Sequence, residues 1–377
     1  MFFMRSLRLH LSFSTFCLVL GSVILFSSCS NTKYLSANES LLTQNIVKIT
    51  DRDEVKDKRA LRDEIAAIPT QKPNRKLLGL ARVKLTCYNS IDTQQVKRKF
   101  YNWFKYKLGE APVVFDTTSM EQSVVLIKNY LFNKGYFQNS VKSSIQTKKQ
   151  KTKVLYSIEY TSPYMLWDVF FPDDSSRTSQ ITRQNQNKTL LKFNTPFDIS
   201  ILKAELDRIT ADLRNKGFYY INKESVHFDL DTSHIERKID VYIRIRPPAD
   251  SGVHKIASIQ NVFVYPNYSL DVNGMSRFTD TFISRNLTYI YDSKKFSERT
   301  LSDFIFLRPG QLYSQERQIQ SVKRLVNLGV FKFVNIDVKD VGDSLQPRLN
   351  MFIYLTPSKR QSYAFSFEQN YSNLGLS

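Results

Sequence analysis

Hydrophobic positions follow the same order in three stretches of the chain. Each stretch has apolar residues at helical spacing, then a glycine, and then two runs rich in β-branched and aromatic residues. In the second stretch the helical stripe is formed by Ile201, Leu202, Leu206, Ile209 and Leu213 on an otherwise charged segment. One apolar face on a polar helix predicts that the helix lies on a sheet, which the following runs can supply.

The three glycines are Gly135, Gly217 and Gly329. The first two follow Asn-Lys, and the third follows Asn-Leu. Glycine adopts a positive φ without steric cost, so it is preferred just after the last turn of a helix. We therefore expect each glycine to end a helix. The helix starts are marked upstream by residue types that cap helix N-termini, namely Asp116, Asp198 and Ser314.

Strand predictions complete each repeat. The runs after the glycines are 136–145 and 154–160, 218–230 and 239–245, and 330–338 and 349–355, and the runs before the helices are 46–49, 165–171 and 256–264. This order predicts an α+β fold of three tandem β-α-α-β-β modules. Proline-containing breaks follow the last run of each repeat and favour module boundaries there. We expect modules at 42–162, 163–250 and 255–357, with an insertion around 70–111 in the first.

The first residues predict secretion. Residues 1–28 have a basic start with Arg5 and Arg8, an apolar stretch, and a small-residue site before Cys29. A cysteine in this place resembles the bacterial lipobox, in which the thiol is acylated and the mature chain begins at the cysteine. An ordinary signal peptide or a transmembrane anchor remains the alternative. Residues 29–41 are polar and predict a lipidated tether.

Composition and charge narrow the function. The 377 residues carry 54 basic and 35 acidic side chains, a formal net charge of +19, which favours anionic partners. Three cysteines and four histidines are too few for a cysteine-rich zinc module or a disulfide-stapled mini-domain. The sequence shows no nucleophile, metal or nucleotide motif. We therefore expect no enzyme activity, no cofactor and no metal.

Cations and aromatic residues alternate around residues 97–107. This pattern favours binding at a membrane interface, where amphipathic rings settle and basic side chains meet anionic headgroups. Core packing is the alternative. Such a pattern can also stack single-stranded nucleic acid, but a lipoprotein outside the cytoplasm rarely meets any. The candidate membrane-interface residues are Lys97, Arg98, Lys99, Phe100, Trp103 and Phe104.

A tandem β-α-α-β-β unit, with a helix that ends in Gly and an aromatic or β-branched pair, resembles the POTRA (polypeptide transport-associated) domain. POTRA domains precede the barrel of the BamA/TamA superfamily of outer-membrane assembly proteins. The lipobox, the stretch 72–79 and Gly109-Glu-Ala-Pro112 resemble TamL, the lipoprotein branch of that superfamily in Bacteroidetes. The resemblance implies an outer-membrane lipoprotein that faces the periplasm. Such a protein would assist the assembly or translocation of outer-membrane proteins through noncovalent binding.

The resemblance also implies partners and a mode of binding. An unfolded client would add a strand to a sheet edge, and the edge would be the strand after each repeat glycine. The partners would be unfolded outer-membrane proteins, the lipid bilayer through acylated Cys29, and an inner-membrane or periplasmic assembly factor, but no nucleic acid. The POTRA region of a two-partner secretion transporter and a lipoprotein that binds cell wall or polysaccharide are the alternatives.

The last residues, 358–377, alternate in the manner of a membrane barrel strand. Tyr363, Phe365 and Phe367 share one face, and small or polar residues share the other. The family places its first barrel strand at this point. We therefore expect the start of a barrel, either truncated here or completed by a partner chain, with a solvent-facing terminal strand as the alternative.

Overall fold

The computed structural model describes residues 31–358 except for 33, 52–57, 78, 80, 92–98, 234–235, 250–251, 269–279, 292 and 343–345. The chain divides into two compact units, one of Met1–Met165 with Asn194–Ile199 and Ile235–Lys238, and one of Leu166–Phe193, Ser200–His234 and Ile239–Ser377. Three separate sheets lie within them. We name modules 1, 2 and 3 after these sheets; the module boundaries given above stay a prediction.

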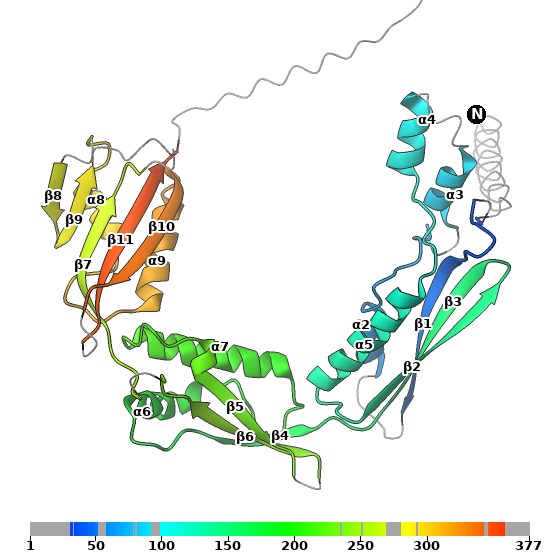
Figure 1. Ribbon diagram of the computed structural model, residues 1–377, viewed down its shortest axis with the longest axis horizontal. Coiled ribbons are helices and arrows are strands. Elements are labelled where there is room, and N and C mark those ends of the chain that lie inside the picture. The colour runs from blue at the N-terminus through cyan, green and yellow to red at the C-terminus, as the bar shows by residue number, and fades with distance from the viewer. Residues whose placement is uncertain are drawn as a thin grey trace, which may run out of the picture. The chain divides into compact units, whose positions relative to one another are not determined.

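Module 1 is built on a three-stranded sheet. Its repeat elements are β1 (Leu41–Asp51), α2 (Lys58–Ala66), α5 (Thr117–Asn133), β2 (Asn139–Lys148) and β3 (Lys151–Tyr160). The strand order is β1-β3-β2, with β1 parallel and β2 antiparallel to β3. Alternate residues of β3 from Val154 to Tyr160 are buried in one core with Ile65 of α2 and Ile127 of α5. Figure 1 shows both helices beside this sheet.

The insertion in module 1 is helical. It contains α3 (Val83–Ser90), α4 (Lys99–Trp103) and the π-helix η2 (Phe104–Leu108). In module 1, β1 begins at Leu41, and both Leu41 and Leu42 are buried. The predicted strand 46–49 is therefore only the middle of β1.

Module 2 repeats the arrangement. Its elements are β4 (Met165–Phe170), α6 (Arg177–Gln184), η3 (Gln186–Lys188), α7 (Ile199–Asn215), η4 (Lys223–Ser225), β5 (Val226–Asp231) and β6 (Lys238–Ile245), with strand order β4-β6-β5. The predicted strand 218–230 was wrong at its start. Phe218 and Ile221 fill the core from a turn, so their apolar character reflects burial and not a strand.

Module 3 has a five-stranded sheet in place of the expected three strands. Its elements are β7 (Ser258–Tyr265), β8 (Asp280–Ser284), β9 (Leu287–Tyr291), α8 (Glu298–Phe304), α9 (Gln315–Asn327), β10 (Phe331–Asp340) and β11 (Arg348–Pro357). The order is β10-β11-β7-β9-β8. The β8–β9 hairpin extends the sheet past β7, and β8 and β10 lie at its opposite sides (Figure 1). The plain β-α-α-β-β order is therefore incomplete for this module.

The repeat glycines lie directly after the ends of α5, α7 and α9. Their φ values are +84° for Gly135, +101° for Gly217 and +70° for Gly329. After α5, the N–H of Tyr136 donates to the carbonyl of Leu131 and the N–H of Gly135 to that of Phe132. This is the Schellman arrangement that satisfies the last carbonyls of a helix.

Several predicted features lie outside the described residues. These are residues 1–28, Cys29, and the barrel-strand candidates Tyr363, Phe365 and Phe367. Within the described part of the chain, no helix has the length and apolar character needed to cross a membrane.

Candidate functional site

Each sheet ends on one side with the strand that follows its repeat glycine. These strands are β2, β5 and β10, and we call their outer sides the open edges. Among the described residues, no strand and no isolated β-bridge pairs with an open edge. An edge strand presents unpaired N–H and C=O groups that another extended segment can bind.

The opposite sides of the sheets are different, because the start of each first strand is occupied by the chain itself. The segment before the second helix of each module forms a bridge there, in the pairs Leu41↔Val114, Met165↔Pro196 and Ser258↔Leu312. In module 3 the N–H of Ile259 donates to the carbonyl of Gln311 at 2.7 Å. In module 1 the N–H of Leu42 donates to that of Val113 at 2.8 Å. Within the described residues, each module thus covers the start of its first strand and keeps its open edge at the strand that follows the glycine.

The open edges differ in length. β2 and β10 have ten residues each, whereas β5 has six. A longer edge offers more main-chain hydrogen bonds to an added strand. All three open edges carry an exposed apolar side chain, Ile145 of β2 at 44%, Phe333 of β10 at 49% and Leu230 of β5 at 40% exposure, so length is what separates them. β2 and β10 are therefore the stronger candidates for binding an extended segment.

The segments that begin the next repeat pack on the first two glycines. A Cβ on Gly135 would lie 3.0 Å from Cβ of Phe197, and one on Gly217 would lie 2.6 Å from Cγ2 of Ile256. A Cβ on Gly329 would meet nothing within 4 Å. The carbonyl of Gly135 accepts from the N–H of Tyr164, and the carbonyl of Gly217 from the N–H of Ala257. These contacts fix the ends of α5 and α7 relative to the chain that begins the next repeat.

A buried acid holds module 2 together. Glu205 of α7 is fully buried and accepts hydrogen bonds from Arg208, the Thr189 hydroxyl and the N–H of Leu190. Burial alone would raise the pKa of Glu205, but these donors keep it below its ordinary value. Every one of these contacts lies inside the module, which gives Glu205 a structural role.

The predicted membrane-interface segment is only partly described. Lys97 and Arg98 lie outside the described residues, and Lys99 and Phe100 belong to α4 without a described side chain. Trp103 is 51% exposed and Phe104 is half-buried. The interface function of this segment stays a prediction.

Lys105, in the same segment, is buried. Its ammonium group donates to the carbonyl of Ile91 at 3.0 Å and lies 4.8 Å from the centre of the Tyr88 ring. This lysine therefore packs the insertion together and does not face a lipid surface.

No group of three or more His, Cys, Asp or Glu side chains among the described residues is placed to hold a metal ion. The arrangement they offer is main-chain binding at the sheet edges.

One family comparison matches the module with the helical insertion. Residues 80–160 match the POTRA family model, described as a surface antigen variable number repeat. The match runs from the insertion of module 1 to the end of β3, and it leaves modules 2 and 3 unmatched. No curated protein matches the chain.

Several solved structures are similar in arrangement. The crystal structure of Haemophilus influenzae BamA POTRA3-5 is 12% identical, covers 85% of this chain and 99% of that chain, and has a TM-score of 0.42. The N-terminal domain of Omp85 from Thermosynechococcus elongatus is 12% identical, with coverage of 86% and 100% and a TM-score of 0.29. CdiB from Escherichia coli is 7% identical, with coverage of 59% and 30% and a TM-score of 0.20. The module assignment rests on the sheet topology and the POTRA match rather than on these superpositions.

Proposed function

We propose that the chain is a periplasmic POTRA scaffold of an outer-membrane protein assembly or translocation factor. Unfolded outer-membrane protein segments add as strands to the open edges, above all to β2 and β10. The observation that carries the proposal is the asymmetry of the sheets. Among the described residues, the chain covers the start of each first strand with its own backbone and leaves the outer side of the strand after each repeat glycine unpaired. Main-chain pairing suits many clients because it does not depend on their side chains.

The test is photo-crosslinking from the open edges. p-Benzoylphenylalanine replaces Ile145 or Phe333 in the full chain, and the probe is a urea-unfolded outer-membrane barrel protein. The matched control is Val125 on α5, which is 55% exposed but lies on a helix. We expect crosslinks from positions 145 and 333 and none above background from 125. Equal yields at all three positions, or none at 145 and 333, would contradict the proposal.

A peptide variant tests the main-chain character of binding. An extended client peptide with N-methyl groups on alternate amides cannot donate to the strand edge. We expect it to lose the crosslinks that the unmodified peptide gives. A scrambled peptide of the same composition should keep them.

The anchor in this proposal is acylated Cys29, which holds the chain at the outer membrane with its modules in the periplasm. Several acyl chains anchor firmly where one would not. Growth with a labelled fatty acid should label the wild-type chain but not the Cys29→Ser variant. Equal labelling of both chains would show that Cys29 is not the acylated residue and would contradict this part of the proposal.

The proposal continues into a barrel at residues 358–377. Tyr363, Phe365 and Phe367 would face lipid from the first strand. A cysteine placed at Phe365 should then react slowly with a water-soluble maleimide in membranes, compared with one placed at Ser366. Equal reactivity would favour a solvent-facing end.

A further inference from the structure

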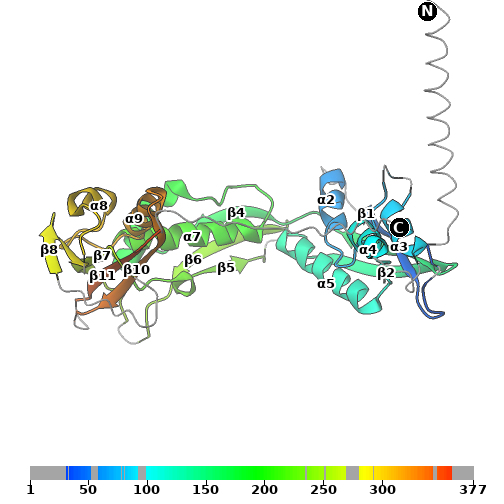
Figure 2. The ribbon, with the colours of Figure 1, turned by 90° about the horizontal axis from the view of Figure 1, so that it is seen from above.

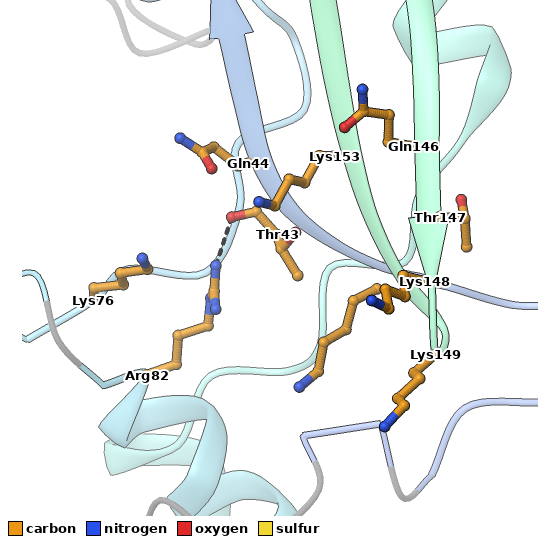
Figure 3. Close-up of a pocket in the computed structure, with 10 residues that line it drawn as sticks. Thr43, Gln44, Lys76, Arg82, Gln146, Thr147, Lys148, Lys149 and Lys153 are labelled. Atoms are coloured by element: carbon orange, nitrogen blue, oxygen red, sulfur yellow. Dashed lines mark hydrogen bonds between the residues drawn. The ribbon is translucent and has the colours of Figure 1, made fainter.

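A cationic pocket lies in module 1, beside the start of β1 and the hairpin end of β2. Its volume is about 620 Å³. Side chains come from three separate stretches: β1, the insertion and the β2–β3 hairpin (Figure 3). The pocket is lined by Thr43, Gln44, Lys76, Arg82, Gln146, Thr147, Lys148, Lys149, Lys151 and Lys153. Six of these ten residues are cationic and none is acidic.

The pocket lysines are not neutralised by the protein. Within the described part of the chain, none of the five lysine ammonium groups has a carboxylate within 4.0 Å. Lys151 and Lys153 point away from the core, because Thr152 and Val154 between and beside them are buried. Like charges held together destabilise the fold and create a positive potential that concentrates anions. The cluster is therefore better explained by an anionic ligand than by a role in the stability of the fold.

Arg82 is the one cation in the pocket with a fixed position. Its Nη2 donates to the carbonyl of Thr43 at 2.5 Å, where the pairing of β1 with β3 shifts register between Leu42 and Gln44. Burial lowers the pKa of its guanidinium. Its Nε is buried and has no acceptor among the described residues. A planar, oriented guanidinium with spare donors matches the oxygens of a phosphate group.

The chain that leads from Cys29 passes beside this pocket. The carbonyl of Asn31, two positions after Cys29, accepts from Nδ2 of Asn89 on α3. The carbonyl of Ser36 accepts from Nε2 of Gln150 at the tip of the β2–β3 hairpin, between pocket residues Lys149 and Lys151. Figures 1 and 2 both show the hairpin tip and α3 at the same end of module 1. Seven positions separate Cys29 from Ser36, a reach of about 25 Å at most.

Exposed aromatic residues lie on the helices of the same insertion. Trp103 and Tyr106 are both more than half exposed. Aromatic side chains of this kind settle at the level of lipid headgroups. The described segment that begins at Asn31, the cations and these rings thus belong to one end of module 1.

We propose that the cationic pocket binds phosphate groups of anionic lipid headgroups and holds this end of module 1 against the membrane. The preference for lipid over a soluble phosphate rests on the proposed acylation of Cys29, whereas the anion site itself does not. The pocket lies outside the membrane-interface residues expected from the sequence. It adds a second point of attachment to a single acylated residue and so limits how module 1 turns about its tether.

The experiment measures partitioning of the full chain into vesicles. All variants carry Cys29→Ser, so that acylation contributes nothing. Vesicles of phosphatidylcholine alone set the baseline, and vesicles that also contain phosphatidylglycerol supply anionic headgroups. The pocket variant is Lys148→Gln with Lys149→Gln and Lys151→Gln. The control variant removes the same charge from exposed positions on α5, on α7 and in the turn after α7, with Lys128→Gln, Lys203→Gln and Lys216→Gln.

The measured quantity is the anionic-lipid gain, the partition coefficient for vesicles with phosphatidylglycerol divided by that for phosphatidylcholine alone. We expect this gain to fall roughly a hundredfold in the pocket variant, because each lysine lost near the surface lowers it roughly fivefold. The control variant should lose far less, and added salt should weaken the wild-type gain. Equal losses in both variants would overturn the proposal, because net charge would then explain the binding. Phosphate binding in solution that the pocket mutations abolish, without a change in vesicle partitioning, would assign the pocket to a soluble phosphate and overturn the lipid assignment.

The same variants separate this inference from the proposed function. Crosslinks from position 333 on β10 should be unchanged in the pocket variant. If vesicle binding is lost while client crosslinking stays complete, the pocket acts independently of the open edges. If crosslinking alone is lost, the result contradicts only the proposed function of the open edges.

Discussion

Modules 1 and 3 share one topology but close their first strand by different means. In module 1 the start of β1 is held by residues 113–115 and by side chains of a helical insertion. In module 3 the start of β7 is bridged by Leu312, which precedes the second helix of that module. The end of β7 is also paired with β9 of an added hairpin. The two insertions are unrelated in structure and lie at different points of the repeat. Both nevertheless fall on the side opposite the open edge.

This difference teaches which part of the module is free to vary. Both insertions contact the first strand, and among the described residues neither pairs with the strand after the glycine. The hairpin of module 3 also creates a new edge at β8, whose Ile283 is 69% exposed. Module 3 therefore presents unpaired edges on both sides of its sheet, and an added client strand has two places to start.

The largest expected effect comes from the hairpin core. Tyr289 of β9 is fully buried, and its hydroxyl lies 2.7 Å from that of Ser302. Burial raises its pKa to about 12. Tyr289→Ala should destabilise module 3 by about 3–5 kcal/mol, the usual cost of an aromatic-to-alanine cavity. Hydrogen exchange of module 3 peptides measures it, and Tyr289→Phe should cost only about 1 kcal/mol as the matched control.

The counterpart in module 1 should cost less. Asn74 donates to the carbonyl of Ala111 at 2.8 Å and accepts from the N–H of Val113 at 3.1 Å. Asn74→Ala removes those bonds but no core, so a loss of about 1–3 kcal/mol confined to the insertion is expected. If Asn74→Ala lowers the free energy of unfolding as much as Tyr289→Ala does, each insertion contributes equally to the stability of its module.

The repeat glycines give the next comparison. Gly135 and Gly329 both have positive φ, so alanine at either position should cost about 1 kcal/mol in backbone strain. Only at Gly135 would the new Cβ also meet neighbours, Cβ of Phe197 at 3.0 Å and its carbonyl at 3.1 Å. Gly135→Ala should therefore cost about 1–3 kcal/mol more than Gly329→Ala.

Denaturant unfolding of the two glycine variants measures the difference. Equal costs would show that the segment around Phe197 moves aside without loss. They would also weaken the view that this glycine fixes the end of α5 against the following segment.

Much of the repeat could be predicted from the sequence, because its signals are local. The glycine after each helix and the runs at 154–160, 239–245 and 349–355 need only helix-end chemistry and alternation. The β8–β9 hairpin escaped prediction because its turn is Arg285-Asn286, with φ of 49° and 63°, in place of the glycine that usually marks such turns.

Other features depended on contacts between distant residues. The aromatic run at 218–221 looked like a strand because burial and strand propensity favour the same residues. The lysines at 148–153 fall between the predicted strands 136–145 and 154–160, where no pattern of the sequence indicates a site. Their meeting with Lys76 and Arg82 depends on the path of the insertion, which no local pattern reveals.

The smallest expected effect distinguishes the helix caps of the two modules. Asp116 caps α5 by accepting from the N–H groups of Thr118 and Ser119, whereas Ser314 caps α9 by accepting from that of Arg317. Hydrogen bonds from the Ser119 hydroxyl and N–H hold the pKa of Asp116 below its ordinary value of about 4. Its stabilisation is thus complete above the unfolded-state pKa and is lost as the pH falls through the folded one.

Amide exchange at the two helix starts, corrected for intrinsic rates, should therefore respond differently to acid. Protection of Ser119 should fall below about pH 4, while that of Arg317 stays constant, because serine does not titrate there. Asp116→Asn keeps an acceptor without a titrating group, and it should make module 1 behave like module 3. Loss of protection at both helix starts together would point to unfolding of the whole chain rather than to the cap, and persistence of the acid response in Asp116→Asn would assign it to another carboxylate.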